Sequence, residues 1–325
     1  MNQAADKKAI SGEGLRAGLE KAGILLVLMA LFILFSLLSA KFCTLVNLFN
    51  IFKQVSHIAI LAIGMTFVFL YGGMDLSAGA NIFLGAVCVA AMLEEGTPVW
   101  AAVLGSVALC AAMGLLNGIV IEKLKINCVI VTLGSQLLIR GIALHRIAAY
   151  RQWIYVKDPT ILYLNTGTVF GMPALLVLTV ILYAVAYLVL SRTAFGRRVY
   201  AVGGNEKAAR LCGLNTSGIK MLCYMISGLC AGVAGVVIAS RLGMVNTTVG
   251  IGMEFDAVTA VVLGGCAVKG GEGSVLKTFV GALIVGMIAN FMTLSGVNEH
   301  FQDAVLGGFI LLAAVFNRFT LGKSD

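Results

Sequence analysis

The chain has 325 residues, of which 60% are apolar and only 12% are charged. A soluble domain carries about 25% charged residues, so this chain lacks the polar surface that a water-soluble fold requires. The composition excludes a soluble enzyme, a disordered tail and a secreted module held together by disulfides. Each membrane-spanning helix uses about 20 apolar residues, so ten spans would leave too little chain for a second folded domain. We therefore expect residues 1–325 to form a single transmembrane domain.

Apolar runs predict about ten spans in chain order. The first, 22–40, follows a polar and basic tail over 1–21 and is too long for the core of a signal peptide. The others lie near 53–71, 78–93, 99–121, 127–145, 172–191, 221–240, 255–268, 278–295 and 303–317. The run at 255–268 is short for a span, which indicates a broken or tilted crossing. The expected fold is an all-α polytopic membrane protein with about ten transmembrane helices, some of them short or broken.

The distribution of Lys and Arg predicts which way the chain faces. With a cytoplasmic N-terminus, sixteen of the 23 Lys and Arg residues fall on inner segments and six on outer segments, and Arg140 lies inside a span. Membrane proteins concentrate these residues on the cytoplasmic side, so both termini are predicted to be cytoplasmic. This distribution also accounts for the net charge of +8 without a nucleic-acid partner.

Glycine is abundant and forms two G-x-x-x-G pairs within predicted spans, Gly114 with Gly118 and Gly228 with Gly232. Small residues at this spacing let helices approach closely in lipid. We interpret both pairs as packing inside one chain rather than as a dimerisation motif.

The residues of an energy-converting or catalytic centre are missing. The only Gly-Lys-Ser triplet, Gly322 to Ser324, has Asn317 where a phosphate-binding loop needs its first glycine. The eight cysteines include no C-x-x-C pair and are interpreted as small apolar residues. No relay of acids and histidines runs through the spans, which disfavours an ion-coupled carrier, although that carrier and a purely structural scaffold stay as alternatives. We expect a non-catalytic protein without metal or cofactor.

The segment 192–220, between the sixth and seventh predicted spans, is the longest and most basic inner loop. Its glycines are expected to break the chain, and Asn205 is a good N-cap for a short amphipathic helix over 205–212 that Gly213 closes. Such a helix has two interpretations of equal weight, contact with anionic lipid headgroups or docking of a soluble partner. The candidate docking residues are Gly196, Arg197, Arg198, Gly203, Gly204, Asn205, Ala208, Arg210 and Gly213.

Two glycine-rich motifs carry acidic residues beside the spans, YGGMDLSAG over 71–79 and EFDAVTAVVLGGCAVKGGEGS over 254–274. In the first motif, Asp75 and Ser77 can form an Asx-type turn. Irregular backbone at membrane depth persists only inside protein or beside a water-filled cavity, so both motifs suit a pathway or gate, although ordinary turns between spans are slightly favoured. Arg140 is expected to pair with a carboxylate or with helix-end carbonyls. The candidate pathway residues are Asp75, Ser77, Asn81, Asn117, Gln136, Arg140, Glu254 and Asp256.

Together these motifs resemble the permease subunits of ribose-type sugar ABC importers. The first motif is similar to the family signature G-x-D-L-S-x-G, FGRRVYAVGGNEKAARLCGLN over 195–215 resembles its cytoplasmic coupling segment, and 254–274 resembles its later glycine-rich segment. The similarity covers nearly the whole chain in the same order. It departs at Ala78, where the family commonly has Val, at Cys266, and at HRIAAYRQWIYVKDP over 145–159, which matches no family pattern.

The resemblance implies an inner-membrane permease subunit that works by alternating access. The implied partners are ABC ATPase subunits, a second permease copy or paralogue, a periplasmic substrate-binding protein and membrane lipid. The implied cargo is a ribose-like pentose, a hexose or a related sugar, and the alternatives are a nucleoside, a branched-chain amino acid or a sugar-like signalling molecule. Hydroxyls and amides in the spans, with few charges, favour the sugar; they are Ser56, Asn81, Asn117, Thr132, Gln136 and Asn290.

Overall fold

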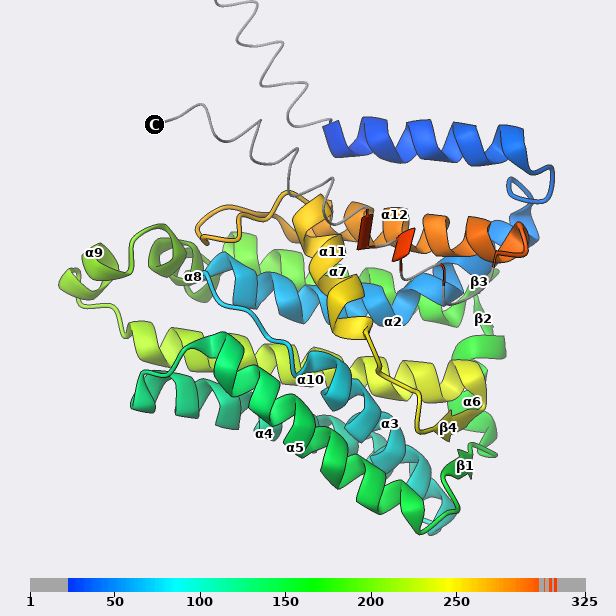
Figure 1. The fold of residues 1–325 in the computed structure, drawn as a ribbon, viewed down its shortest axis with the longest axis horizontal. Coiled ribbons are helices and arrows are strands. Elements are labelled where there is room, and N and C mark those ends of the chain that lie inside the picture. Colours follow the sequence, from blue (N-terminus) through cyan, green and yellow to red (C-terminus); the bar gives the residue numbers. More distant parts are fainter. Residues whose placement is uncertain (1–22, 298–300, 302–303, 306, 309–325) are drawn as a thin grey trace, which may run out of the picture.

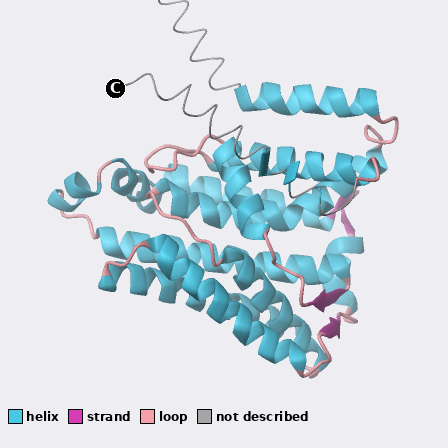
Figure 2. Ribbon diagram, in the orientation of Figure 1, coloured by secondary structure: helices cyan, strands magenta, loops and turns pink. Residues whose placement is uncertain are grey.

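The computed structural model describes residues 23–297, 301, 304–305 and 307–308, and this part of the chain is almost entirely helical (Figure 1; Figure 2). Six of its helices are long and apolar enough to cross a membrane. They are α2 (Leu45–Leu70), α4 (Val99–Leu124), α5 (Cys128–Ala148), α7 (Ala174–Arg192), α10 (Thr216–Leu242) and α12 (Val275–Leu294). The expected all-α membrane fold is confirmed, with six such helices among the described residues.

The remaining predicted spans are shorter or lie outside the described residues. Apolar helices cover Gly23–Leu38 and α3 (Ala78–Glu94). Helix α11 (Met253–Leu263) has only 11 residues and reaches roughly 16 Å, about half of the hydrocarbon thickness. The run predicted at 255–268 is therefore an interrupted crossing, which ends before Gly264. The tail over 1–21 and nearly all of 303–317 fall outside the described residues.

Several helix boundaries differ from the apolar runs because polar caps extend the helices. Helix α2 begins at Leu45 rather than near residue 53, and Thr44 accepts a hydrogen bond from the Asn47 amide at its start. Helix α10 begins at Thr216 rather than near 221, where Asn215 accepts from the Gly218 amide at 2.9 Å. Capping satisfies amide groups that the first helical turn leaves free, so a helix can begin in polar sequence.

Helices α2 and α10 form the centre of the bundle and pack against each other. Helices α3, α4 and α5 lie on one side of this pair, with α4 against α10, and α12, α7 and α11 lie on the other (Figure 1). Helices α2, α3 and α10 each contribute more buried side chains than any other helix. This layering places α3 and α11, the two shorter helices, where longer helices surround them.

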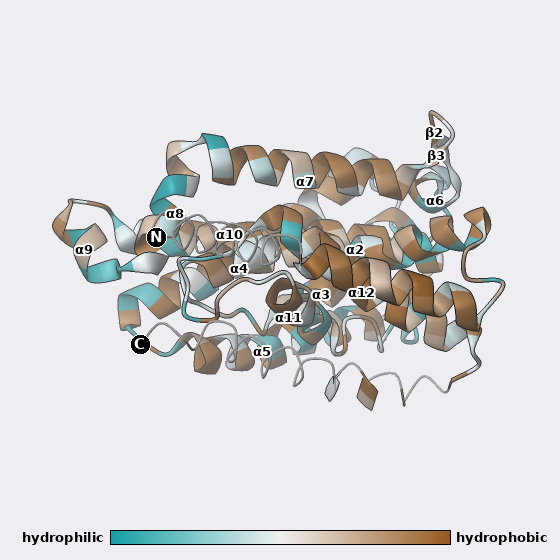
Figure 3. Cartoon of the chain, turned by 90° about the horizontal axis from the view of Figure 1, so that it is seen from above, coloured by the Kyte–Doolittle hydropathy of each residue, from teal (hydrophilic) through white to brown (hydrophobic). Residues whose placement is uncertain are grey.

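The two ends of the bundle carry different elements. One end holds α8 (Ala194–Gly204) and α9 (Glu206–Leu211), and hydrophilic residues lie on them and on neighbouring helix ends (Figure 3). The other end holds α6 (Pro159–Thr166) and four short strands. Strand β1 (Trp153–Tyr155) pairs antiparallel with β4 (Met244–Asn246), and β2 (Thr168–Val169) pairs with β3 (Met172–Pro173). The predicted inner loop 192–220 and the predicted outer stretch 145–159 thus lie at opposite ends.

The two G-x-x-x-G pairs pack against each other within the chain, as predicted. A Cβ atom on Gly114 would overlap the Tyr224 carbonyl oxygen, and one on Gly228 would overlap the Cys110 carbonyl oxygen. Helices α4 and α10 therefore approach backbone to backbone.

Replacing Gly228 by Ala should destabilise this contact by about 1–3 kcal/mol, because the added methyl group forces the helices apart. The matched control is Gly134→Ala on α5, where a Cβ would meet nothing within 4 Å. Alanine favours a helix by about 1 kcal/mol over glycine, so the control should be neutral or stabilising. Thermal unfolding in detergent measures both, and equal midpoints for the two variants would contradict the assignment.

Candidate functional site

Two interrupted crossings meet inside the bundle. After α2 the chain continues without helix over 71–77 before α3, and after β4 it turns over 247–252 before α11. Both helices begin between the two ends of the bundle (Figure 1). A Cβ atom on Gly250 would overlap the Gly79 carbonyl oxygen, and one on Gly79 would overlap the Glu254 carboxylate. The N-terminal ends of α3 and α11 are thus in direct contact.

A buried polar cluster surrounds the start of α3. Asp75 accepts hydrogen bonds from the Ser77 amide (3.1 Å), the Ser77 hydroxyl (2.6 Å) and the Ser227 hydroxyl (2.7 Å). Asn117 donates to the Ser77 hydroxyl at 2.9 Å and accepts from Ser135 at 2.5 Å. The predicted Asx-type turn at Asp75 is confirmed. We call these five residues the Asp75 cluster.

A second cluster surrounds the start of α11. Gln136 donates to Glu254 Oε1 at 2.7 Å. Arg140 donates to the carbonyl oxygens of Thr247 (2.5 Å) and Val249 (3.4 Å), and its guanidinium lies 5.0 Å from the Phe83 ring centroid. Arg140 was expected to pair with a carboxylate or with helix-end carbonyls, and the carbonyls that it binds belong instead to the turn before α11.

The two clusters are neighbours, because Ser135 of the first and Gln136 of the second are consecutive on α5. Helix N-termini carry partial positive charge, which suits the carboxylates of Asp75 and Glu254 that lie beside them. Discontinuous helices that meet at mid-depth commonly form the cargo sites of transporters. The geometry therefore fits a site for a small polar molecule.

Two buried acceptor atoms at this place have no hydrogen-bond partner among the residues that the structure describes. Asn81 uses its amide nitrogen on the Cys110 carbonyl (3.0 Å), whereas its Oδ1 has no partner among the described residues. Within the same residues, Glu254 Oε2 also lacks a hydrogen-bond partner. Two buried acceptors match a ligand that donates hydroxyl groups, because buried polar atoms are normally paired.

The remaining candidate pathway residue, Asp256, and the other polar residues of the predicted spans lie elsewhere or use their polar groups locally. Asn290 bonds with Asn47 (2.9 Å) and Gln54 (3.2 Å) on α2. Ser56 and Thr132 donate to carbonyls within their own helices. Asp256 is half-buried in the first turn of α11. Ser135 and Ser227 were not predicted as site residues from the sequence, because single serines in apolar runs give no signal of a distant partner.

The predicted docking segment forms two short helices. Asn205 accepts from the Ala208 amide at 2.9 Å and begins α9, and Gly213 follows with a φ of +79°, so the predicted capped helix is confirmed. The expected chain break at Gly196 is wrong, since this residue lies inside α8, whereas α8 does end at the expected Gly203-Gly204 pair. At two of them glycine serves close packing: a Cβ on Gly196 would overlap the Leu190 carbonyl, and one on Gly203 would overlap the Leu70 carbonyl.

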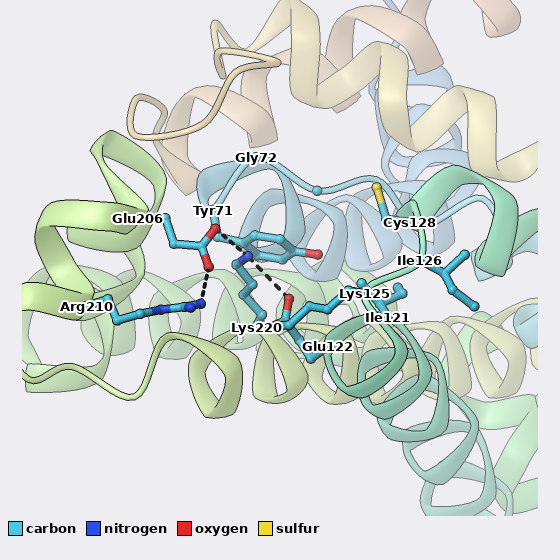
Figure 4. A pocket seen from close by; sticks show the side chains of 11 residues that line it. Tyr71, Gly72, Ile121, Glu122, Lys125, Ile126, Cys128, Glu206, Arg210 and Lys220 are labelled. Carbon is cyan, nitrogen blue, oxygen red and sulfur yellow. Dashed lines mark hydrogen bonds and ion pairs between the residues drawn. The ribbon is translucent and has the colours of Figure 1, made fainter.

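An ionic network ties α9 to the bundle (Figure 4). Lys220 of α10 lies 2.7 Å from Glu206 of α9 and 3.3 Å from Glu122 of α4. The Glu122 side chain is only 4% exposed, and Lys125 also pairs with it at 3.1 Å. Arg210 bonds Glu206 at 3.0 Å. The hydrogen bond from Lys220 lowers the pKa of the Glu206 carboxyl, so the network is charged at neutral pH.

The outward side of the same segment is exposed. Arg197, Arg198 and Ala208 are exposed, and Leu211 at the end of α9 is 90% exposed. These exposed residues include several of the predicted docking residues. We call α8 and α9 together the coupling segment.

At the opposite end, the stretch that matches no family pattern forms the end of α5, strand β1 and the start of α6. Trp153 and Tyr155 expose about half of their surface there. Arg146 and Tyr150 both donate to Glu95, and these hydrogen bonds lower the pKa of the Glu95 carboxyl.

Replacing Arg140 by Leu should cost about 1–3 kcal/mol of folding stability, because it leaves the carbonyls of the turn before α11 without their charged donor. Arg140→Lys should retain part of that stability, since one ammonium cannot match the guanidinium geometry. Arg192→Leu, at an exposed position at the end of α7, is the control. Thermal unfolding measures all three variants. An unfolding midpoint of Arg140→Leu equal to that of the control would refute the assigned role.

Comparisons with known proteins agree with this architecture. Residues 47–314 match the family described as branched-chain amino acid transport system / permease component. The chain is 36% identical to the ribose import permease protein of Bacillus subtilis over 82% of its own length and 83% of the relative. It is 34% identical to the L-arabinose transport system permease protein of Escherichia coli over 82% of this chain and 80% of the relative. No solved structure matches the chain.

Proposed function

Because the chain belongs to the family described as branched-chain amino acid transport system / permease component, we propose that it is the membrane subunit of an ATP-driven importer for a sugar. The observation that carries this proposal is the similarity to a ribose and an arabinose permease over more than four fifths of the chain. The cargo is a ribose-like pentose, a hexose or a related small sugar. The subunit is a multi-pass protein of the inner membrane and is itself non-catalytic.

The partners follow from the family. ATPase subunits bind the coupling segment and hydrolyse ATP, and a substrate-binding protein delivers cargo at the end that holds β1 and β4. Closure of the ATPases moves the coupling segment, and the bundle alternates between outward-open and inward-open forms. A second permease copy or paralogue completes the membrane part, and about ten spans cross the bilayer. The basic residues beside the helix ends face the headgroups of membrane lipid.

The Asp75 cluster and its neighbour around Glu254 form the gate or cargo contact of this pathway. Support comes from their position at two interrupted helices and from the acceptors of Asn81 and Glu254, which are unpaired within the described part of the chain. A sugar donates several hydroxyl hydrogen bonds and carries no charge. An amino acid would need a cation and an anion held for it, whereas Arg140 already binds two backbone carbonyls.

Uptake by reconstituted vesicles tests the cargo directly. The tagged permease is purified with its associated subunits, and radiolabelled D-ribose, L-arabinose, leucine and a nucleoside are compared with and without ATP. ATP-dependent uptake of a sugar supports the proposal. Uptake of leucine or the nucleoside alone would overturn the sugar assignment, and uptake without ATP would point to an ion-coupled carrier.

Replacing Leu211 by Asp should reduce copurification of the ATPase subunits severalfold, because a charge replaces an exposed apolar contact at the docking surface. The matched control is Phe170→Asp, since Phe170 is 98% exposed at the other end of the bundle. Quantitative mass spectrometry of the affinity-purified complexes gives the ratio of ATPase to permease. Equal ratios for both variants would show that α9 is not the docking surface.

Replacing Asp75 by Asn should reduce transport by about tenfold or more while assembly persists, because serine hydroxyls can reorient to bond the amide but the charge at the helix start is lost. Copurified ATPase and initial uptake rate are measured on the same preparation. The control is Asp158→Asn, at the cap of α6 away from this cluster. Unchanged uptake in the Asp75 variant would remove this cluster from the pathway.

A further inference from the structure

We propose that Gly203 is a positioning residue that joins the coupling segment to both interrupted crossings, and that Lys220 holds this joint in register. The inference rests on the proposed function, since it concerns how motion of a docked ATPase reaches the Asp75 cluster. It assigns a role to backbone contacts rather than to the exposed docking surface.

Three separate parts of the chain meet at Gly203 through their backbones. A Cβ atom there would overlap the carbonyl oxygen of Leu70 and lie 2.5 Å from the amide nitrogen of Gly271. The Gly271 amide donates to that same Leu70 carbonyl at 2.8 Å. In turn, a Cβ on Gly271 would lie 2.9 Å from the backbone of Gly204. The end of α8, the end of α2 and the loop before α12 are therefore in contact without intervening side chains.

A second pair of glycines extends the contact. A Cβ on Gly270 would lie 2.7 Å from the Gly72 nitrogen, and Gly72 and Gly270 both have positive φ angles, of +88° and +90°. Tyr200 of α8 donates to the Gly273 carbonyl at 3.0 Å. Side chains can slide past one another, whereas backbone in van der Waals contact transmits displacement directly. A shift of α8 must therefore move Leu70 and Gly271.

The joint touches both interrupted crossings, the first at its start and the second just after the end of α11. Leu70 is the last residue of α2, and Asp75 follows it by only five positions along the non-helical segment. The loop that holds Gly270 and Gly271 connects α11, whose first turn carries Glu254, to α12. The joint thus contacts the segment that leads to Asp75 and the loop after α11, the helix whose opposite end carries Glu254.

Lys220 sets the position of α9 beside the joint. Its ammonium lies between Glu206 of α9 and the buried Glu122 of α4, and 5.8 Å from the ring centroid of Tyr71 (Figure 4). Tyr71 is the first residue of the non-helical segment. An ion pair with a buried partner holds a defined geometry, because separating it leaves a charge unpaired inside the protein. Helix α9 is thereby held against the residue at which that segment begins.

The test uses the complete complex of permease and ATPase subunits in vesicles, with a binding protein loaded with D-ribose. The measured quantity is ribose transported per ATP hydrolysed, after copurified ATPase has shown that each variant assembles. Gly203→Ala should assemble and hydrolyse ATP, but its transport per ATP should fall about tenfold, because the methyl group separates α8 from Leu70. Gly105→Ala on α4 is the control, since a Cβ there would meet only the flexible end of Met92. It should match the wild type.

A second pair of variants covers the case in which Gly203→Ala does not assemble. Lys220→Gln should lower transport per ATP about threefold without loss of assembly, and Lys220→Arg should restore it by keeping the charge between the two glutamates. Wild-type coupling in Gly203→Ala would overturn the joint. If Gly203→Ala fails to assemble, wild-type transport per ATP in Lys220→Gln would overturn the joint instead.

The wild-type complex separates failure of this inference from failure of the proposed function. If the wild type hydrolyses ATP but does not move ribose, ribose is excluded as the cargo, and stimulation of ATP hydrolysis by the binding protein replaces uptake as the coupling measurement for the same variants. If no ATPase copurifies with the wild type, both the function and the joint are overturned.

Discussion

The requirement that every backbone polar group inside a bilayer be hydrogen-bonded governs this structure. An uninterrupted helix meets the requirement by itself, so the long helices need only apolar surfaces and close contacts such as that between α4 and α10. The segments 71–77 and 247–252 do not meet it, because neither is helical. The side chains of Asp75 and Arg140 bond backbone groups of these two segments, the Ser77 amide and the Thr247 carbonyl. The polar clusters exist where the helices are interrupted, and longer helices surround them.

The same constraint explains which features could be predicted from sequence. Apolar runs of about 20 residues identify spanning helices because hydrocarbon thickness sets their length. The Asp75 turn and the Asn205 cap were predictable because each depends on residues within three positions of one another. Helix starts at Leu45 and Thr216 were missed, since the helices extend beyond the apolar runs. The partners Ser227 and Glu122 could not be found, because contacts between distant helices leave no local pattern.

The glycines of 194–204 show how one residue type supports opposite predictions. Glycine in a loop sequence suggests a break, because it gives the backbone freedom and disfavours a helix. In α8 the glycines are helical, and two of them allow close contact, with the Leu190 carbonyl at Gly196 and with Leu70 at Gly203. Only a tertiary partner distinguishes these uses. Gly72 and Gly270 show the same dependence, since they lie against each other across almost two hundred residues of chain.

An importer has to connect a soluble motor to a site buried in lipid, and the arrangement of charge in this chain suits that task. The exposed charges and Leu211 occupy the outer side of the coupling segment, whereas its inner side contacts the bundle through glycine backbone and one buried ionic network. Exposed charges are screened and adapt easily to a partner surface. Backbone contacts and a buried ion pair are neither screened by salt nor able to adapt in this way. On the proposed coupling, the segment is adaptable where it meets the ATPase and stiff where it meets Leu70, so that displacement on docking passes toward Asp75 rather than being absorbed within the loop.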